Sequence, residues 1–392
     1  MFAFLKSLRK TAWCAVVPVA VFVLSACDPA AIGGSTGARF DTSKPVSVAL
    51  LVPRGSDRLS DDLLAQNLEN AARLAMRDLR GVEIDLRVYD TAGDAQIAAN
   101  QAKQAVSDGA KIILGPLYAE AANAAGVAVA SRNVNVLAFS NNTTIAGDNV
   151  FVLGSTFDST AQRLVSHAVR EGKDRIVIVH AQDVAGQLGS EAIQRAIAQN
   201  GATFAGAVGY PLSQQDVVAA IPTIRATINE NAANAVFMTA TTAGGLPLLT
   251  QLLPEAGVNP TITQYIGLTR WDIPPQTLEL PGVQDGWFAL PDPRRSAAFE
   301  ALYKDAYQEL PHPLAGLAFD GIAAIGALVR QGNIDALSGA SLTQNAGFQG
   351  ASGVFRLLRD GTNQRGLAVA TVRDKKVVVI SSAPRSFGRA GF

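Results

Sequence analysis

Short apolar runs alternate with helical stripes along most of the chain, and this alternation limits the possible folds more than any other feature. An apolar run at residues 46–52 ends at Pro53-Arg54-Gly55, and residues 64–79 then place apolar side chains at helical spacing. Strands that are apolar throughout and are separated by helices indicate a parallel sheet covered on both faces. The further strands expected on this basis cover residues 84–89, 112–114, 136–139, 175–180, 203–208, 235–239, 262–266 and 286–290.

The alternation occurs in two successive blocks, separated by a crossover near residues 153–156, and this indicates two lobes. A third stretch is less regular. We expect a helix over 296–309 with Phe299, Leu302, Tyr303 and Tyr307 as apolar contacts, and an Ala/Gly-rich helix over 315–329. Antiparallel strands are expected at 354–358 and within 366–380, with a turn at 374–376 and a loose tail from Ser381.

The N-terminus has the pattern of a cleavable bacterial signal. Three basic residues, Lys6, Arg9 and Lys10, precede an apolar run that closes with Leu-Ser-Ala-Cys at residues 24–27. This ending resembles a lipobox, which implies that residues 1–26 are removed and that Cys27 carries lipid chains. The chains would hold the protein at a membrane of the periplasm, at about 0.8 kcal/mol for each buried CH₂. Asp28 resembles an inner-membrane retention signal, and the choice of membrane stays open.

The composition of the mature chain excludes several classes of function. Cleavage removes three bases and no acid from a chain with 33 basic and 33 acidic residues, so the net charge becomes −3. This balance does not favour nucleic acid as a partner. Cys14 is removed and Cys27 is lipidated, which leaves no thiol for a disulfide, a metal or catalysis. Residues 27–43 lack periodicity and indicate a flexible tether.

Four segments resemble the type I periplasmic binding fold, specifically the superfamily of branched-chain amino-acid (Leu/Ile/Val) binding proteins. They are the strand and turn at 46–55, Ile-Ile-Leu-Gly-Pro-Leu at 112–117, Val-Leu-Ala-Phe-Ser-Asn-Asn at 136–142, and residues 299–324. The resemblance covers about residues 44–382. It implies an α/β fold of two lobes, each a parallel sheet flanked by helices, with three inter-lobe crossovers. The implied lobes are 44–155 plus 284–345 and 156–283 plus 346–385.

Ligands of open parallel sheets collect outside the carboxyl ends of the strands, where loops diverge and helix N-termini point their free N–H groups. This rule selects six loops. The strongest candidate is the loop at 140–143, whose hydroxyls and amides suit an anionic group such as a carboxylate. The alternative is that the same residues cap the next turn. The candidate ligand-binding residues are Arg54, Leu117, Tyr118, Ser140, Asn141, Asn142, Thr143, Asp183, Ala185, Thr239, Thr241, Thr269 and Trp271.

Two positions depart from the pattern of amino-acid binders. Ala185 stands where such proteins usually carry a Tyr, and the loop at 267–271 has no acid for a ligand ammonium before Asp272. Two functions therefore stay open. One is binding of a small polar solute, of the amino-acid or amide type, for delivery to an ABC transporter permease or for sensing. The other resembles the lipoprotein activators of penicillin-binding proteins, which use this fold to dock on a peptidoglycan synthase.

The sequence contains no pattern typical of an enzyme. The histidines, His167, His180 and His312, are scattered without metal-ligand spacing, and His180 is the better functional candidate because it ends a strand at the cleft side. No nucleophile motif, phosphate-binding loop or early dinucleotide fingerprint occurs. We therefore expect no catalytic residue, no metal and no cofactor.

Overall fold

The computed structural model describes residues 37–387. The predicted signal peptide, the lipidation site at Cys27 and most of the predicted tether lie outside the described residues. Residues 37–43 were expected to belong to the tether, but Phe40 is buried in the core of the first lobe and Arg39 pairs with Asp335 at 2.9 Å.

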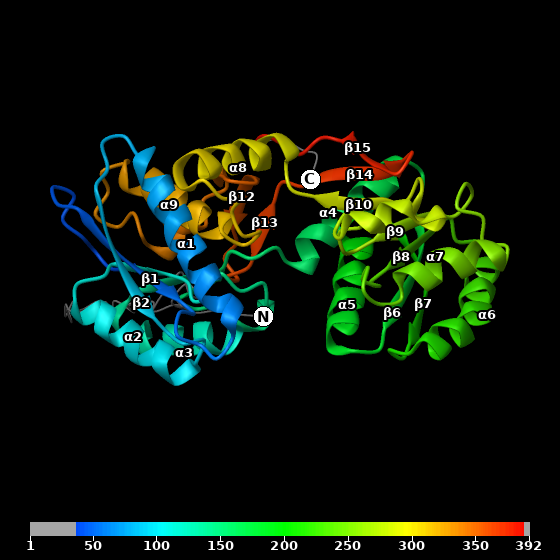
Figure 1. The fold of residues 1–392 in the computed structure, drawn as a ribbon, viewed down its shortest axis with the longest axis horizontal. Coiled ribbons are helices and arrows are strands. Elements are labelled where there is room, and N and C mark those ends of the chain that lie inside the picture. Colours follow the sequence, from blue (N-terminus) through cyan, green and yellow to red (C-terminus); the bar gives the residue numbers. More distant parts are fainter. Residues whose placement is uncertain (1–36, 388–392) are drawn as a thin grey trace, which may run out of the picture. The chain divides into compact units, whose positions relative to one another are not determined.

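The first lobe is built on a five-stranded sheet in which every pairing is parallel, in the order β2-β1-β3-β4-β5 (Figure 1). Helices α1 and α9 cover one face, and α2 and α3 cover the other. Along β1, Val48 and Leu50 enter one core whereas Ala49 and Leu51 enter the other, which explains why the strand is apolar throughout. The elements are β1 (Val46–Val52), α1 (Leu59–Arg77), β2 (Ile84–Asp90), α2 (Ala95–Ser107), β3 (Ile112–Leu114), α3 (Ala119–Val129), η1 (Ala130–Arg132), β4 (Asn135–Ala138), η2 (Thr143–Ile145), β5 (Val150–Val152), α8 (Pro293–Tyr307), α9 (Gly316–Val329) and α10 (Gly339–Leu342).

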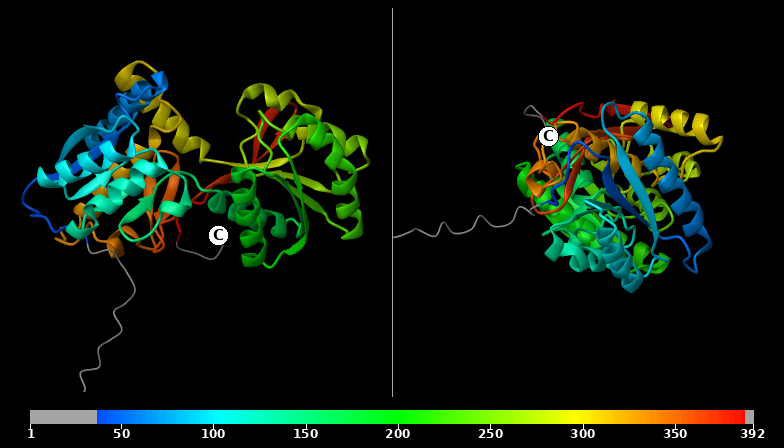
Figure 2. Two further views of the ribbon diagram at one scale, coloured as in Figure 1. Left: turned by 90° about the horizontal axis from the view of Figure 1, so that it is seen from below. Right: turned by 90° about the vertical axis from the view of Figure 1, so that its left-hand side faces the viewer.

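The second lobe is built on a seven-stranded sheet in the order β15-β14-β10-β9-β8-β6-β7. Five strands are parallel, and the hairpin β14-β15 adds two antiparallel strands beside β10. Helices again cover both faces, α4 and α5 on one and α6 and α7 on the other (Figure 2). The elements are α4 (Phe157–Arg170), β6 (Arg175–Ala181), α5 (Val184–Gln199), β7 (Thr203–Tyr210), α6 (Gln214–Glu230), β8 (Ala235–Met238), α7 (Leu246–Glu255), β9 (Gln264–Gly267), η3 (Pro275–Glu279), η4 (Pro281–Val283), β10 (Trp287–Leu290), β14 (Ala368–Arg373) and β15 (Lys376–Ser381).

A small antiparallel sheet completes the first lobe and moves two expected lobe boundaries. Its strands are β11 (Phe348–Gly350), β12 (Gly353–Leu357) and β13 (Asn363–Arg365). Residues 346–365 were expected in the second lobe, but Phe348 and Phe355 pack in the core of the first. Conversely, residues 284–290 were expected in the first lobe, but β10 pairs with β9 and β14 of the second sheet. The chain therefore crosses between the lobes after β10 and after β13.

The expected α/β fold of two lobes is confirmed, with local corrections. Strand β5 and helices α6 and α7 were not anticipated; Pro222 and Pro254, inside the two helices, weaken the helical signal. Leu302 is exposed rather than a core contact. The loose tail expected from Ser381 is wrong for residues up to 387, because Phe387 is buried with the Arg356 guanidinium 4.8 Å from its ring centre.

Candidate functional site

A cavity with a volume of about 1060 Å³ lies at the carboxyl ends of the parallel strands. We call it the cleft. Both sheets contribute to its walls, together with the segments where the chain crosses between lobes. Residues of the first lobe that line it include Leu117, Tyr118, Ala119, Ser140, Asn141, Asn142 and Glu300, and those of the second lobe include Arg270, Asp272, Ile273, Val377 and Val379.

The loop after β4 presents polar groups in a fixed arrangement. Ser140 is buried, and its Oγ accepts a hydrogen bond from the backbone N–H of Asn142 at 3.1 Å. The Asn142 Oδ1 in turn accepts from the backbone N–H and the hydroxyl of Thr144, so that it caps η2. Both proposed roles of this loop are therefore compatible, because Ser140, Asn141 and Asn142 line the cleft while Asn142 also stabilises the turn. Thr143 begins η2 and is not among the lining residues.

Tyr118 is a rigid part of the cleft wall. Its hydroxyl donates to the carboxylate of Asp61, whose oxygens lie 2.7 and 2.8 Å away, and Ser56 Oγ donates to the same carboxylate at 2.7 Å. The Arg58 guanidinium lies 4.8 Å from the centre of the Tyr118 ring. Gly93 makes room for the ring, because a Cβ at this position would lie 2.9 Å from a ring carbon. Burial raises the pKa of Tyr118, and the Asp61 carboxylate adds to this rise.

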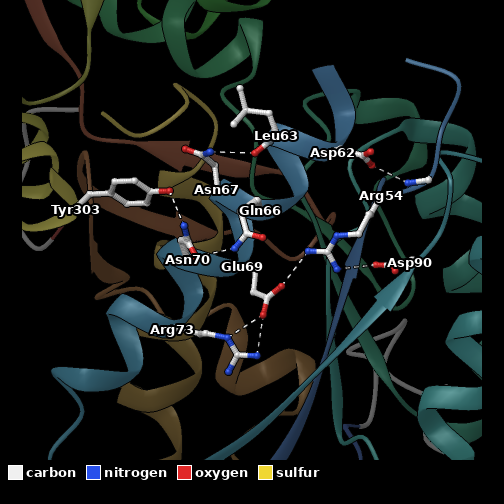
Figure 3. A network of polar contacts seen from close by, with 11 residues as sticks. Arg54, Asp62, Leu63, Gln66, Asn67, Glu69, Asn70, Arg73, Asp90 and Tyr303 are labelled. Atoms are coloured by element: carbon white, nitrogen blue, oxygen red, sulfur yellow. Dashed lines mark hydrogen bonds and ion pairs between the residues drawn. The ribbon is translucent and has the colours of Figure 1, made fainter. Parts of the chain in front are cut away.

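Arg54, another predicted ligand residue, is occupied by carboxylates of its own lobe. Figure 3 shows its side chain directed at Glu69 and Asp90, at 3.0 and 3.1 Å. Glu69 also pairs with Arg73 at 2.8 Å, and the guanidinium groups lower the pKa of the Glu69 carboxyl against the opposing effect of burial. Arg54 is not among the residues that line the cleft, so the structure gives it a role in joining α1 to β2.

The predicted ligand residues of the second lobe mostly bond to backbone groups of the same lobe. Asp183 caps α5 by accepting from the Gly186 N–H at 2.7 Å, and Ala185 lies exposed in the first turn of that helix. Thr239 Oγ1 accepts from the Ala181 N–H, and Thr269 donates to the Ala240 carbonyl. Thr241 is exposed in the loop after β8. None of these five residues is among those that line the described cleft.

Trp271 lies in the core of the second lobe and is fully buried. Its ring stacks with Phe288 at a centroid distance of 6.2 Å, and it packs so closely on two glycines that a Cβ at Gly267 or Gly286 would lie 2.1 Å from the indole. The flanking side chains, Arg270 and Asp272, line the cleft instead. Trp271 therefore fixes the loop after β9 from the inside.

Several lining residues were not anticipated from the sequence. Arg270 is one, and Asp272 was noted only as the first acid of its region. Others come from segments that follow no parallel strand, namely Ser296, Glu300, Pro311, Leu317, Ser352 and Arg365. A rule that considers strand ends alone cannot find them. The sequence signal available for Arg270 and Asp272 was an Arg and an Asp on either side of a Trp in a strand-end loop.

The histidines show no catalytic arrangement within residues 37–387. Burial, followed by the nearby Arg163, lowers the pKa of His167 to about 4, and its ring lies 4.8 Å from that of Trp287. His180 contacts its neighbouring carbonyl, at Ala181, at 3.0 Å. His312 lines the cleft, and burial lowers its pKa. The described part of the chain contains no group of three or more His, Cys, Asp or Glu residues placed to hold a metal ion.

Comparison with known proteins identifies the class. The model of the periplasmic binding protein family matches residues 45–376, and the chain belongs to this family. No curated protein matches it. Similar solved structures include a protein from Rhodospirillum rubrum described as a branched-chain amino acid ABC transporter (16% identity, TM-score 0.72, covering 86% of this chain and 100% of that one). Another is an ABC transporter substrate-binding protein from Desulfitobacterium hafniense in complex with Leu (16%, 0.60, 86% and 100%).

A third similar structure is a solute-binding protein of an ABC transporter from Rhodopseudomonas palustris in complex with 3,4-dihydroxybenzoic acid (16% identity, TM-score 0.55, 88% of this chain and 98% of that one). At these identities the solved structures establish the type I periplasmic binding fold. The family consists of binding proteins of the periplasm, and no helix within residues 37–387 has the length and apolar character needed to span a membrane.

Proposed function

We propose that this protein is a lipid-anchored periplasmic receptor that binds a small polar solute, of the amino-acid or amide type, in the cleft between its lobes. The observation that supports this most is the cleft of about 1060 Å³ at the carboxyl ends of parallel strands from both sheets, where Ser140, Asn141 and Asn142 offer polar groups. Ligand pockets of proteins fall in this range of volume and carry a few such groups among apolar walls. The bound solute would pass to an ABC transporter permease or signal its own presence.

The test is the thermal stability of the mature protein with millimolar amino acids, amides and organic acids. A solute at a hundredfold excess over its Kd stabilises the folded state by about 2.7 kcal/mol, which raises the melting temperature measurably. A rise with one solute class supports the proposal. An unchanged melting temperature across the whole panel contradicts it.

The lipid anchor has a separate test. Replacement of the predicted lipidation site, Cys27→Ser, should release the protein from the membrane fraction into the soluble periplasmic fraction, because the buried acyl chains supply the attachment. A Cys14→Ser variant, changed within the predicted signal peptide, is the matched control and should stay membrane-bound. Membrane attachment of the Cys27→Ser protein would contradict the anchor.

A second candidate is an activator of a penicillin-binding protein that uses the fold as a docking scaffold. The observation that favours it is in the second lobe, where the predicted ligand residues Asp183, Thr239 and Thr269 bond to backbone groups of that lobe. This function predicts that the mature protein raises the rate of a purified peptidoglycan synthase. An unchanged rate, together with a solute-dependent melting temperature, would decide for the receptor.

A further inference from the structure

The loop after β9 places a cation and an anion together on the wall of the cleft. Trp271, buried between Gly267 and Gly286, fixes the middle of the loop. Arg270 and Asp272, on either side of it, both line the cleft. The arrangement is therefore set by a buried ring and two glycines, and the two charged side chains are held close to each other at the ligand-binding surface.

Arg270 and Asp272 form a two-pronged ion pair. Arg270 Nε donates to Asp272 Oδ1 at 2.9 Å, and Arg270 Nη2 donates to Oδ2 at 2.5 Å. The Asp272 side chain is 15% exposed and that of Arg270 is 40% exposed. Parallel hydrogen bonds between a guanidinium and a carboxylate are strong and specific in geometry. Both oxygens of Asp272 are thus engaged, whereas Arg270 Nη1 makes none of the described bonds.

This pairing determines which charge a ligand can bring to the second lobe. A ligand ammonium would have to compete with Arg270 for Asp272 and would lie close to a guanidinium of the same sign. A carboxylate or an amide carbonyl can instead accept from the free edge of Arg270. The first lobe contributes further hydrogen-bond donors to the same cleft, the Ser140 hydroxyl and the amide of Asn141.

We propose that the cleft selects carboxylates that lack a free ammonium group, either N-acylated amino acids or acids without an amino group, because Arg270 masks Asp272. This inference rests on the proposed receptor function and specifies which charged groups its ligand carries. Arg270 and Asp272 are the residues that determine the specificity.

Two further charged side chains, Arg365 and Glu300, line the cleft. Arg365 lines the cleft, but its guanidinium is bonded to Asp320 at 2.8 Å and to the Leu153 carbonyl at 3.1 Å. The other carboxylate among the described lining residues is Glu300, which lies on the exposed face of α8 rather than in a strand-end loop. Because Glu300 could still attract an ammonium group, its replacement belongs in the experiment.

The experiment uses three sets of compounds with matched side chains, based on leucine, phenylalanine and glutamate. Each set contains the amino acid, its N-acetyl derivative and the acid without the amino group. Binding to the mature protein is measured by calorimetry, with melting temperature as a second readout. In at least one set we expect the acetylated or amino-free member to bind about tenfold or more tightly than the amino acid, the size of one charge-assisted hydrogen bond.

The variant Arg270→Ala frees Asp272 and should reverse this ratio in favour of the amino acid. A matched control is Arg195→Ala, which breaks an Arg–Asp pair on the surface of the same lobe, with Asp158 at 2.8 Å, and should leave the ratio unchanged. Glu300→Gln should also leave it unchanged.

The outcomes separate the two proposals. Tightest binding of the amino acids by the unchanged protein overturns this inference and leaves the receptor function standing. The same holds if Arg270→Ala keeps the original ratio, or if Glu300→Gln changes it. Absence of binding by every compound of the three sets and by the wider panel of solutes overturns the receptor function itself.

Discussion

Tyr118 illustrates how single polar side chains are held at the cleft. It donates to Asp61, a carboxylate that is 3% exposed and also accepts from Ser56. When a buried carboxylate loses a hydrogen-bond donor, that bond no longer offsets the free-energy cost of removing the carboxylate from water. The hydroxyl of Tyr118 therefore contributes to stability as well as to the shape of the wall.

The variant Tyr118→Phe should lower the free energy of unfolding by about 1–3 kcal/mol, because Asp61 loses this hydrogen bond while the ring remains. The measurement is urea denaturation at pH 7. Tyr307→Phe is the control, since its hydroxyl donates to a backbone carbonyl, that of Asn70, and its loss should cost less. Equal losses in the two variants would contradict this description of Asp61.

His167 gives the protein a defined dependence on pH. Its pKa in the folded state, about 4, lies below the ordinary value of 6.5, so that between these values the unfolded chain binds a proton that the folded chain does not. The contribution of neutral His167 to the free energy of unfolding is complete above pH 6.5 and is lost as the pH falls towards 4. The loss should reach roughly 2–3 kcal/mol.

This prediction is tested by urea denaturation of the unchanged protein and of His167→Gln at pH 7 and pH 4.5. Other groups titrate equally in both proteins, so the difference between the two pH profiles isolates His167. The unchanged protein should lose more stability on acidification. Parallel profiles would refute the assignment.

For single residues, the sequence predicts some of the loops that lie at the cleft but not which way each side chain points. The order of strands and loops predicts that Ser140 and Asn142 lie at the cleft, and they do. It does not predict that Trp271 turns inward, because this depends on three-dimensional neighbours such as Gly267 and Gly286. A polar or aromatic residue in a strand-end loop can face the ligand or its own backbone, and the sequence pattern is the same in both cases.

At the scale of elements, the crossovers between the lobes are tied together by Arg365. This residue ends β13, and its guanidinium bonds to Asp320 on α9 and to the Leu153 carbonyl in the first crossover. Its backbone N–H donates to Ser159 on α4, in the other lobe. Burial raises the pKa of the Asp320 carboxyl, and the Arg365 guanidinium opposes that rise. The Arg365 side chain thus joins α9 to the first crossover, and the Arg365 backbone contacts the second lobe.

Removal of the cation alone, Arg365→Met, should destabilise the protein by about 3–5 kcal/mol, because it leaves Asp320 buried without its partner. The double variant Arg365→Met/Asp320→Asn removes that unpaired charge and should lose less than the sum of the two single variants in urea denaturation. Arg195→Met, at an exposed pair, should cost at most about 1 kcal/mol. Additive losses at Arg365 and Asp320 would contradict the coupling.

For whole elements, most of the strands were predicted correctly from the sequence, whereas two of the boundaries between the lobes were not. Residues 286–290 and 354–358 were recognised as strands from their apolar pattern. Which sheet a strand joins depends on its pairing partners, and β10 pairs with β9 and β14. Local periodicity carries no information about that partner. The expected positions of the crossovers therefore differed from the observed ones by the length of a strand or of a small sheet.

At the scale of the whole molecule, the two sheets bring their strand ends to one cleft, whose walls come from loops far apart in the sequence. This follows from the arrangement of parallel strands and was predictable. The contribution of the crossovers and of α8 to the walls was not, because these segments have no recurrent sequence pattern. The proposed function requires that a solute binds at this cleft.

Amide hydrogen exchange of the mature protein, with and without the solute that raises its melting temperature most, tests that claim directly. If the solute binds at the cleft, we expect slower exchange in the strand-end loops at residues 117–119, 140–142 and 268–273, which contain residues that line the cleft. Unchanged exchange in these three loops would contradict binding at the cleft. This holds whether the solute protects other segments or no solute protects any segment.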